Sequence, residues 1–364
     1  MPAYDEHIVD LEKELSTTKY NKATQHHIGL IKAKLAKLKE KQEKRGSGGK
    51  KGEGYSVRKT GDGTVLLLGF PSVGKSTLLN QLTDAHSEVG AYDFTTLDVV
   101  PGVMEYNHAR IQILDVPGIV RGAASGRGRG REVLSVMRNA DLCLMVLDVN
   151  HPEHLAVLQK EVYDSGIRLN QRRPDVKIKK TSKDGIRVGA TVRLTQINKE
   201  VIQSILKEFR INNADVLIRE DISDDQLIDC IEDNKKYLFG LIALNKADMA
   251  SPETVDRVMK ETRADIAISA ENGYNIAPLR ELIFRKLKFI RIYMKEPRKE
   301  ADMKVPMIMF EGSSIQSICE KLHRDFVKKF KYVKVTGPSS KFPGQKLSLK
   351  HLLKDGDIVE LHLK

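Results

Sequence analysis

The residues with the clearest chemical meaning form a short glycine-rich run at positions 69–76, with the sequence GFPSVGKS. This run matches the pattern Gly-x4-Gly-Lys-Ser/Thr, and it lies between the apolar run 65–68 and a helix-like segment at 77–82. Between a strand and a helix, such a loop points backbone amides and the positive helix end at phosphate oxygens. A chance glycine-rich turn is the alternative, but the flanking strand and helix argue against it. The predicted phosphate-binding residues are Gly69, Pro71, Ser72, Val73, Gly74, Lys75, Ser76 and Thr77.

Magnesium ligands are expected at the end of this loop and at the next apolar run. Lys75 is predicted to bridge the β- and γ-phosphates, and Ser76 to offer its hydroxyl oxygen to Mg²⁺, which prefers hard oxygen ligands. Asp115 ends the apolar run 111–114 and is expected to hold a magnesium-bound water. Gly118, in the sequence Asp-Val-Pro-Gly, would offer its amide to the γ-phosphate. An ordinary strand-ending turn is the alternative for 115–118.

A second polar loop predicts the choice of base. Asn245, Lys246 and Asp248 belong to the sequence Asn-Lys-Ala-Asp, directly after the apolar run 238–244. The carboxylate of Asp248 can accept two hydrogen bonds from the N1 and N2 edge of guanine, whereas adenine would leave the charge unpaired. GTP is therefore favoured over ATP. Asn245 and Lys246 would brace the loops.

One further base contact is expected after the next strand. The triplet Ser269, Ala270 and Glu271 occurs in the right order and place for it. The Ala270 amide is expected to contact the guanine carbonyl. The triplet alone is a weak signal.

The segment 92–97, YDFTTL, is interpreted as a loop that orders when nucleotide binds. A threonine there would reach Mg²⁺ only when the γ-phosphate is present; Thr96 is favoured over Thr95, and the choice stays open. A polar loop or edge strand is the simpler alternative. In the glycine-rich run 122–130, Arg127 or Arg129 could neutralise transition-state charge, although a solvated arginine is the competing interpretation. The predicted catalytic residues are Lys75, Thr96 and Gly118.

Short apolar runs that alternate with helix-like segments predict an α/β fold, a P-loop core with a mostly parallel sheet and helices on both faces. The core is expected at 64–165 and 235–293, because the gap between them is too long for a crossover and indicates an inserted α/β subdomain at 166–234. In this insert, 176–180 and 186–194 are predicted to form a hairpin, with a helix near 199–209.

The flanking regions are expected to form separate parts. Apolar residues at helical spacing predict a helical hairpin at 1–45, and a basic, glycine-rich linker follows at 46–63. After a helix-like stretch at 276–293, a strand, helix and strand set at 294–364 fits a small β-grasp domain, although its composition alone does not distinguish it from other α+β domains.

Composition bounds the partners. Lys and Arg number 61 against 49 acidic residues, so the net charge of +12 favours polyanions, RNA above all, with a solvated basic surface as the alternative. Aromatic residues make up 5% of the chain, which does not indicate a base-stacking platform. The three cysteines lack metal-like spacing, and neither a signal peptide nor a membrane-spanning run is recognisable. We expect a cytoplasmic monomer without membrane contact.

These motifs together resemble the developmentally regulated GTP-binding proteins, in the Obg-like branch of the TRAFAC GTPases. The resemblance covers nearly the whole chain and is carried by NKAT at 21–24, LIKAKLAKL at 30–38, GFPSVGKSTLLN, DFTTLDVVPG, DVPGIVRGA and GRGRGREVL. It implies an N-terminal helical domain, an insert like one found in ribosomal proteins and a C-terminal TGS domain of β-grasp fold. It also implies ribosome association and, for some members, a stabilising zinc-finger partner protein.

One position departs from many GTPases. Ile119 stands where they carry the glutamine that orients the attacking water, so intrinsic hydrolysis should be slow. Potassium-activated relatives commonly have asparagine at the position of Ser72, which leaves K⁺ as an open candidate beside GTP, GDP and Mg²⁺. The sequence therefore predicts a slow GTPase acting as a nucleotide-dependent switch in translation. An RNA-binding scaffold stabilised by guanine nucleotide, with negligible turnover, is the alternative; extra catalytic residues for a triphosphate-driven RNA enzyme are not recognisable.

Overall fold

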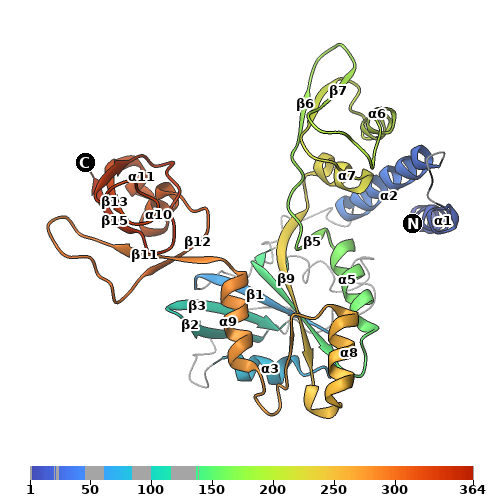
Figure 1. Cartoon of the computed structure of the whole chain (residues 1–364). Coiled ribbons are helices and arrows are strands. Elements are labelled where there is room, and N and C mark those ends of the chain that lie inside the picture. Colours follow the sequence, from blue (N-terminus) through green and yellow to red (C-terminus); the bar gives the residue numbers. More distant parts are fainter. Residues whose placement is uncertain are drawn as a thin grey trace. The chain divides into compact units, whose positions relative to one another are not determined.

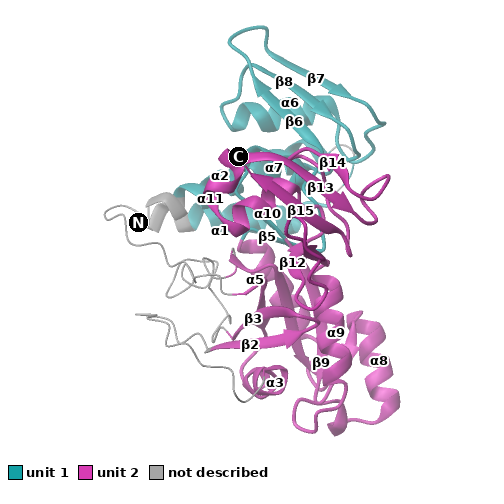
Figure 2. Ribbon diagram, turned by 90° about the vertical axis from the view of Figure 1, so that its left-hand side faces the viewer, with its two compact units in different colours: residues 1–54, 166–237 teal, residues 55–165, 238–364 magenta. Residues whose placement is uncertain are grey.

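The structure is a computed structural model that describes residues 2–19, 21, 24–45, 61–83, 100–115, 137 and 139–363. The chain divides into two compact units, each built from two separate segments (Figure 2). Unit 1 comprises Met1–Gly54 and Gly166–Tyr237, and unit 2 comprises Tyr55–Ser165 and Leu238–Lys364. No helix within the described ranges is long and apolar enough to cross a membrane.

Unit 2 contains a sheet in which parallel pairs predominate (Figure 1). The strand order is β10-β9-β4-β1-β3-β2, and the short strand β5 pairs with β9. Only the edge pair β2 and β3 is antiparallel along this path. The strands are β1 (Gly63–Leu68), β2 (Val100–Tyr106), β3 (Ala109–Asp115), β4 (Leu142–Asp148), β9 (Lys236–Asn245) and β10 (Ile266–Ala267). Strand β5 (Ile167–Leu169) and the first two residues of β9 belong to unit 1. The predicted α/β class with a mostly parallel sheet is confirmed.

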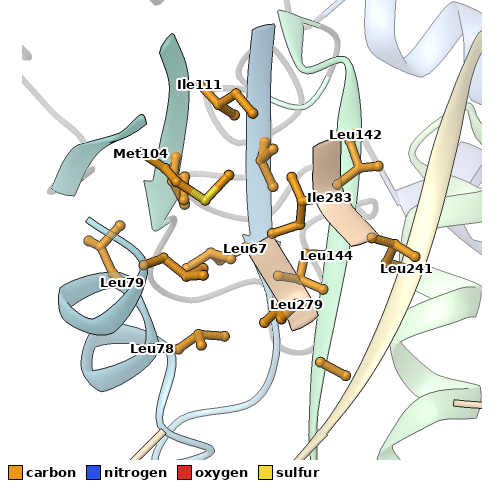
Figure 3. Packing of buried hydrophobic residues seen from close by; sticks show 14 of the residues in the cluster. Leu67, Leu78, Leu79, Met104, Ile111, Leu142, Leu144, Leu241, Leu279 and Ile283 are labelled. Atoms are coloured by element: carbon orange, nitrogen blue, oxygen red, sulfur yellow. The ribbon is translucent and has the colours of Figure 1, made fainter. Parts of the chain in front are cut away.

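The helices of this region pack on the buried strands. Strands β1 and β4 are buried along their whole length, as expected for a sheet covered on both faces. One face packs against helices α3 and α9 through Leu78, Leu79, Leu279 and Ile283 (Figure 3). The helices and the 3-10 turn are α3 (Lys75–Leu82), α5 (His154–Asp164), η1 (Ala247–Met249), α8 (Pro252–Thr262) and α9 (Ile276–Lys286). The sheet is thereby a rigid base for the loops at its carboxyl edge.

A second sheet closes unit 2 at the C-terminal end. Its order is β12-β11-β15-β13-β14, and its core includes Ile292, Ile318 and Val333. The elements are β11 (Phe289–Met294), β12 (Met307–Phe310), α10 (Ile315–Leu322), α11 (Arg324–Lys329), β13 (Phe330–Thr336), β14 (Gln345–Leu347) and β15 (Ile358–Leu363).

The helix predicted over 276–293 is wrong at its C-terminal end. Helix α9 ends at Lys286, and the following residues form strand β11 of the C-terminal sheet. Ile290 and Ile292 are buried in the core of that sheet, so burial against β12 and β15 decides their conformation. The C-terminal domain therefore begins several residues before position 294, the predicted start.

Unit 1 combines the N-terminal helices with the segment inserted into the main sheet. Helices α1 (Pro2–Thr17) and α2 (Gln25–Arg45) pack through Ile8, Ile31 and Leu35, with Leu11, Leu15 and Leu38 around them, so the predicted hairpin is confirmed. The inserted elements are β6 (Val176–Lys180), β7 (Ile186–Ala190), α6 (Lys199–Glu208), β8 (Ala214–Ile218) and α7 (Asp224–Glu232).

The predicted hairpin of β6 and β7 is wrong. Strand β8 lies between them, antiparallel to β6 and parallel to β7. Every second residue of β8 is buried, whereas β6 and β7 are half-exposed or exposed throughout. The more apolar strand, β8, therefore lies at the centre of the sheet. Asp184 and Gly185 have left-handed backbone and lie in the turn that connects β6 to β7 across β8.

Helix α2 packs on the insert although more than a hundred residues separate the two in the chain. Ala33 is fully buried in the same core as Val201 and Ile205 of α6. Polar contacts border this core: the ammonium of Lys32 lies 2.6 Å from Asp225 Oδ2, and that of Lys37 donates to the carbonyl of Glu208 at 2.6 Å. The helical hairpin and the insert thus share one core.

We expect Ala33→Asp to open this core, because an unpaired carboxylate would be buried against α6. The free energy of local opening at α6 should fall by about 2–3 kcal/mol. Native-state hydrogen exchange of the α6 amides measures it. Lys34→Asp, on the exposed neighbouring position, is the control and should leave α6 protected. Unchanged protection of α6 in Ala33→Asp would contradict the shared core.

Candidate nucleotide site

The glycine-rich loop joins β1 to α3, as predicted. Ser72 and Gly74 both have left-handed backbone, with φ of 62° and 91°. A Cβ on Gly69 would lie 2.6 Å from the carbonyl oxygen of Val146 on β4. The described residues of the first turn of α3 include no acidic side chain, and no side chain caps its amides. The loop therefore leaves its amides and the positive helix end open to an anion.

Lys75 folds back over this loop. Its ammonium donates to the carbonyl oxygens of Gly69 and Phe70, each at 3.0 Å. Burial lowers the pKa of Lys75, and the nearby charge of Asp115 opposes this shift. A phosphate group would offer this partly desolvated ammonium stronger acceptors than two neutral carbonyls do.

Ser76 and Asp115 meet where magnesium ligands were expected. The hydroxyl of Ser76 donates to Asp115 Oδ2 at 3.0 Å. Asp115 is 5% exposed, and its Oδ1 is buried with no hydrogen-bond partner among the described residues. A hard hydroxyl and a carboxylate with a spare buried oxygen suit a hydrated Mg²⁺.

Asn245 ties the phosphate loop to the loops after β9 and β10. Its side chain is buried, at 2% exposure, and donates from Nδ2 to the carbonyl of Val73 at 2.7 Å. Its Oδ1 accepts from the amide of Ala270 at 2.9 Å. A Cβ on Gly74 would lie 2.5 Å from the same Nδ2. The side chain amide of Asn245 is thus a bracket between three loops.

The Ala270 amide was expected to face the guanine carbonyl. In this structure it is occupied, because Asn245 accepts from it. Ser269 is fully buried and accepts from the amide of Asn272 at 3.2 Å, while Glu271 is exposed. Ala270 and Ser269 therefore shape this loop, and the hydrogen bond from the Ala270 amide to the base stays a prediction.

Lys246 has a partner that the sequence analysis missed. Its ammonium lies 2.7 Å from Asp148 Oδ2, at the end of β4, and Asp148 pairs in register with Asn245. Asp148 is 7% exposed; burial alone would raise its pKa, but the hydrogen bond from Lys246 and the amide of Asn150 lower it overall. An acidic residue at the end of an apolar strand, as at Asp115, was the signal that could have identified it.

The carboxylate of Asp248, which is predicted to select the base, is accessible. Asp248 lies in the short turn η1, and it is exposed. Lys246, the residue before this turn, has left-handed backbone with φ of 61°, and the Ala247 amide donates to the Ile268 carbonyl at 3.1 Å. The turn is thus anchored while the carboxylate of Asp248 is free to meet a base.

Several predicted residues lie outside the described part of the chain. They are Thr95, Thr96, Gly118, Ile119, Arg127 and Arg129.

Fold and site together define a P-loop nucleotide-binding protein. Residues 64–180 match the family described as 50S ribosome-binding GTPase, 183–289 match the C-terminal region of that domain, and 290–363 match the TGS domain. The chain is 52% identical to an uncharacterized GTP-binding protein of Methanocaldococcus jannaschii, over 99% of this chain and 93% of the relative. It is 42% identical to developmentally-regulated GTP-binding protein 2 of Homo sapiens, over 98% of each chain, and 42% identical to developmentally-regulated GTP-binding protein 1 of Xenopus laevis, over 97% of each.

The chain belongs to the family of developmentally regulated GTP-binding proteins. It is a GTP-binding protein of the GTPase class with a C-terminal TGS domain. The resemblance seen in the sequence is confirmed.

Asp148→Asn should loosen the base loop, because it removes the ionic partner of Lys246. We expect GDP to dissociate about tenfold faster, which corresponds to about 1.4 kcal/mol. Stopped-flow release of a fluorescent GDP measures it. Asp256→Asn, at an exposed position of α8, is the control. Because the pKa of Asp148 is lowered, the ion pair makes its full contribution at any pH above the ordinary carboxyl pKa. The contribution is lost only as the pH falls through the lowered pKa of Asp148. A release rate of Asp148→Asn equal to that of the parent, with both measured between pH 6 and 8, would count against a role for the pair.

Asp248→Asn should redirect base selection from guanine towards xanthine, since an amide matches the carbonyl at position 2 of xanthine. Competition between GDP and xanthosine diphosphate measures the ratio of affinities, which should change by at least about a hundredfold. Glu253→Gln, at an exposed position of α8, is the control. Retained selectivity for guanine would show that Asp248 does not contact the base.

Proposed function

We propose that this protein binds GTP with Mg²⁺, hydrolyses it slowly to GDP and phosphate, and acts as a nucleotide-dependent switch in translation through ribosome or RNA association. The observation that carries the nucleotide part is the Asn245 bracket, which joins the phosphate loop to the loops expected at the base. Because one buried side chain contacts both loops, the site would bind the phosphates and the base as a single unit.

Ser76 and Asp115 would hold the magnesium ion, Ser76 directly and Asp115 through water. When bound, the ion would neutralise charge on the phosphate oxygens. Thr96 is proposed as a further ligand, present only with the γ-phosphate, and Gly118 as the amide donor to that phosphate. Lys75 would orient the phosphates. A comparison of GTP hydrolysis rates in K⁺ and in Na⁺ tests whether the protein requires potassium.

The rate is proposed to be low because Ile119 cannot orient water. Single-turnover hydrolysis should therefore be slow for the isolated protein and at least about tenfold faster with ribosomes. Measured release of phosphate from pre-bound GTP gives both rates. Lys75→Ala, which should lose the nucleotide, controls for contaminating activity. A rate that no translational component changes would favour the alternative, a scaffold that only holds the nucleotide.

Support for an RNA partner comes from the outer face of the inserted sheet. Val176 and Ile178 of β6 pack on the core of unit 1, so alternation puts Lys177 and Lys179 on the opposite, exposed face. Arg187 of β7 is also exposed and pairs with Asp215 at 2.8 Å. This basic face suits backbone phosphates.

The remaining partner proposals rest on the family and the composition. The matching family model is itself described as a 50S ribosome-binding GTPase, which agrees with a ribosomal partner. We also propose a zinc-finger protein as stabilising partner, and a monomer located in the cytoplasm.

The basic face gives a direct test. Lys177→Glu with Lys179→Glu should weaken ribosome binding at least about tenfold and reduce its salt dependence. Sedimentation with ribosomes in GTP, GDP and a non-hydrolysable analogue measures it. Arg257→Glu with Lys260→Glu, at exposed positions of α8, makes the same change in net charge. Equal loss in both double variants would mean that overall charge, and no particular face, attracts the ribosome.

A further inference from the structure

The connection between β4 and α5 carries two histidines that the nucleotide site does not use. It follows Asp148 with the sequence Val-Asn-His-Pro-Glu-His, residues 149–154. The ring of His154 stacks on Phe70 in the phosphate loop, with centroids 3.9 Å apart and planes at 12°. The ring of His151 lies 5.2 Å from that of His154. Both imidazoles therefore lie beside the phosphate loop.

The side chains of His151, Glu153 and His154 converge. Each offers one potential ligand atom, and these atoms all lie within 4.8 Å of one another. His151 Nδ1 and Glu153 Oε1 are 3.1 Å apart. His154 Nδ1 is shielded from solvent and has no hydrogen-bond partner in the part of the chain that the structure describes. We propose that these three side chains form a binding site for a divalent first-row transition metal ion of the zinc type.

The donor set selects the class of ion. Two imidazole nitrogens and one carboxylate oxygen suit zinc and its neighbours, whereas Mg²⁺ and Ca²⁺ prefer oxygen ligands only. Three protein ligands leave a position for water, as in open zinc sites. Pro152 lies between the first two ligands and restricts the backbone, so less conformational freedom is lost when they bind together.

The dipole of helix α5 and the carboxylate of Glu153 act on a bound cation in opposite directions. Helix α5 begins at His154, and its positive end opposes a metal ion. The carboxylate of Glu153 offsets this, because its Oε1 lies 3.1 Å from His151 Nδ1 and supplies a negatively charged oxygen ligand.

Zinc titration of the GDP-bound protein in excess Mg²⁺ tests the proposal, because Mg²⁺ then occupies the nucleotide site. Isothermal calorimetry should show one zinc ion per chain. His151→Ala and Glu153→Gln, both at exposed positions, should each weaken zinc binding about a hundredfold, while the stacking of His154 on Phe70 is left in place. His7→Ala, on an exposed histidine of α1, and Cys230→Ser should bind zinc as the parent does.

Two further measurements distinguish loss of the metal ligands from loss of the fold. The circular dichroism spectrum and GDP stoichiometry of each variant should match the parent. Cobalt(II), added in place of zinc, should give a visible absorption band that His151→Ala abolishes. Stoichiometric zinc binding that survives both His151→Ala and Glu153→Gln, or an absence of zinc binding by the parent, would overturn the site, whatever the outcome of the hydrolysis experiments.

Discussion

The buried side chain of Asn245 is the constraint on which the nucleotide site depends. Its amide donates to the Val73 carbonyl in the phosphate loop and accepts from the Ala270 amide in the loop after β10. Removing such a group leaves a buried carbonyl and a buried amide without partners, at a cost of about 1–3 kcal/mol for each. The two loops come from distant parts of the chain, and this bracket sets their separation.

The position of the Asn245 side chain explains the identity of several neighbouring residues. Gly74 must lack a side chain because a Cβ would meet Asn245 Nδ2 at 2.5 Å. Asp148 ends the neighbouring strand β4 in register with Asn245, so it can hold Lys246 one residue further along. The parallel sheet below brings the ends of β1, β3, β4 and β9 to one edge, where Ser76 and Asp115 also meet. The residues proposed to bind phosphate, metal and base are thus aligned by a single sheet.

The sequence predicted the parts whose physics is local. The glycine-rich loop and its flanking strand and helix follow from a motif in which neighbours in sequence are neighbours in space. The bracing role of Asn245 was predicted from its own short motif, although its partners Val73 and Ala270 lie far from it in the sequence. The N-terminal hairpin followed from helical spacing of Ile8, Leu11 and Leu15. The central position of β8 and the burial of Ala33 against α6 depend on contacts between distant segments, which spacing does not encode. Asp148 was missed because its role needs the register of β4 and β9, and β11 because tertiary burial overrides a helical pattern.

The most direct measurement is calorimetric binding of GDP with Mg²⁺ to the parent and to Asn245→Ala. If the bracket holds both loops in place, the variant should bind about a hundredfold more weakly, which corresponds to about 2.8 kcal/mol. Asn80→Ala, at an exposed position of α3, should bind as the parent does. An Asn245→Ala protein that is folded and binds GDP with the parent's affinity would contradict the account.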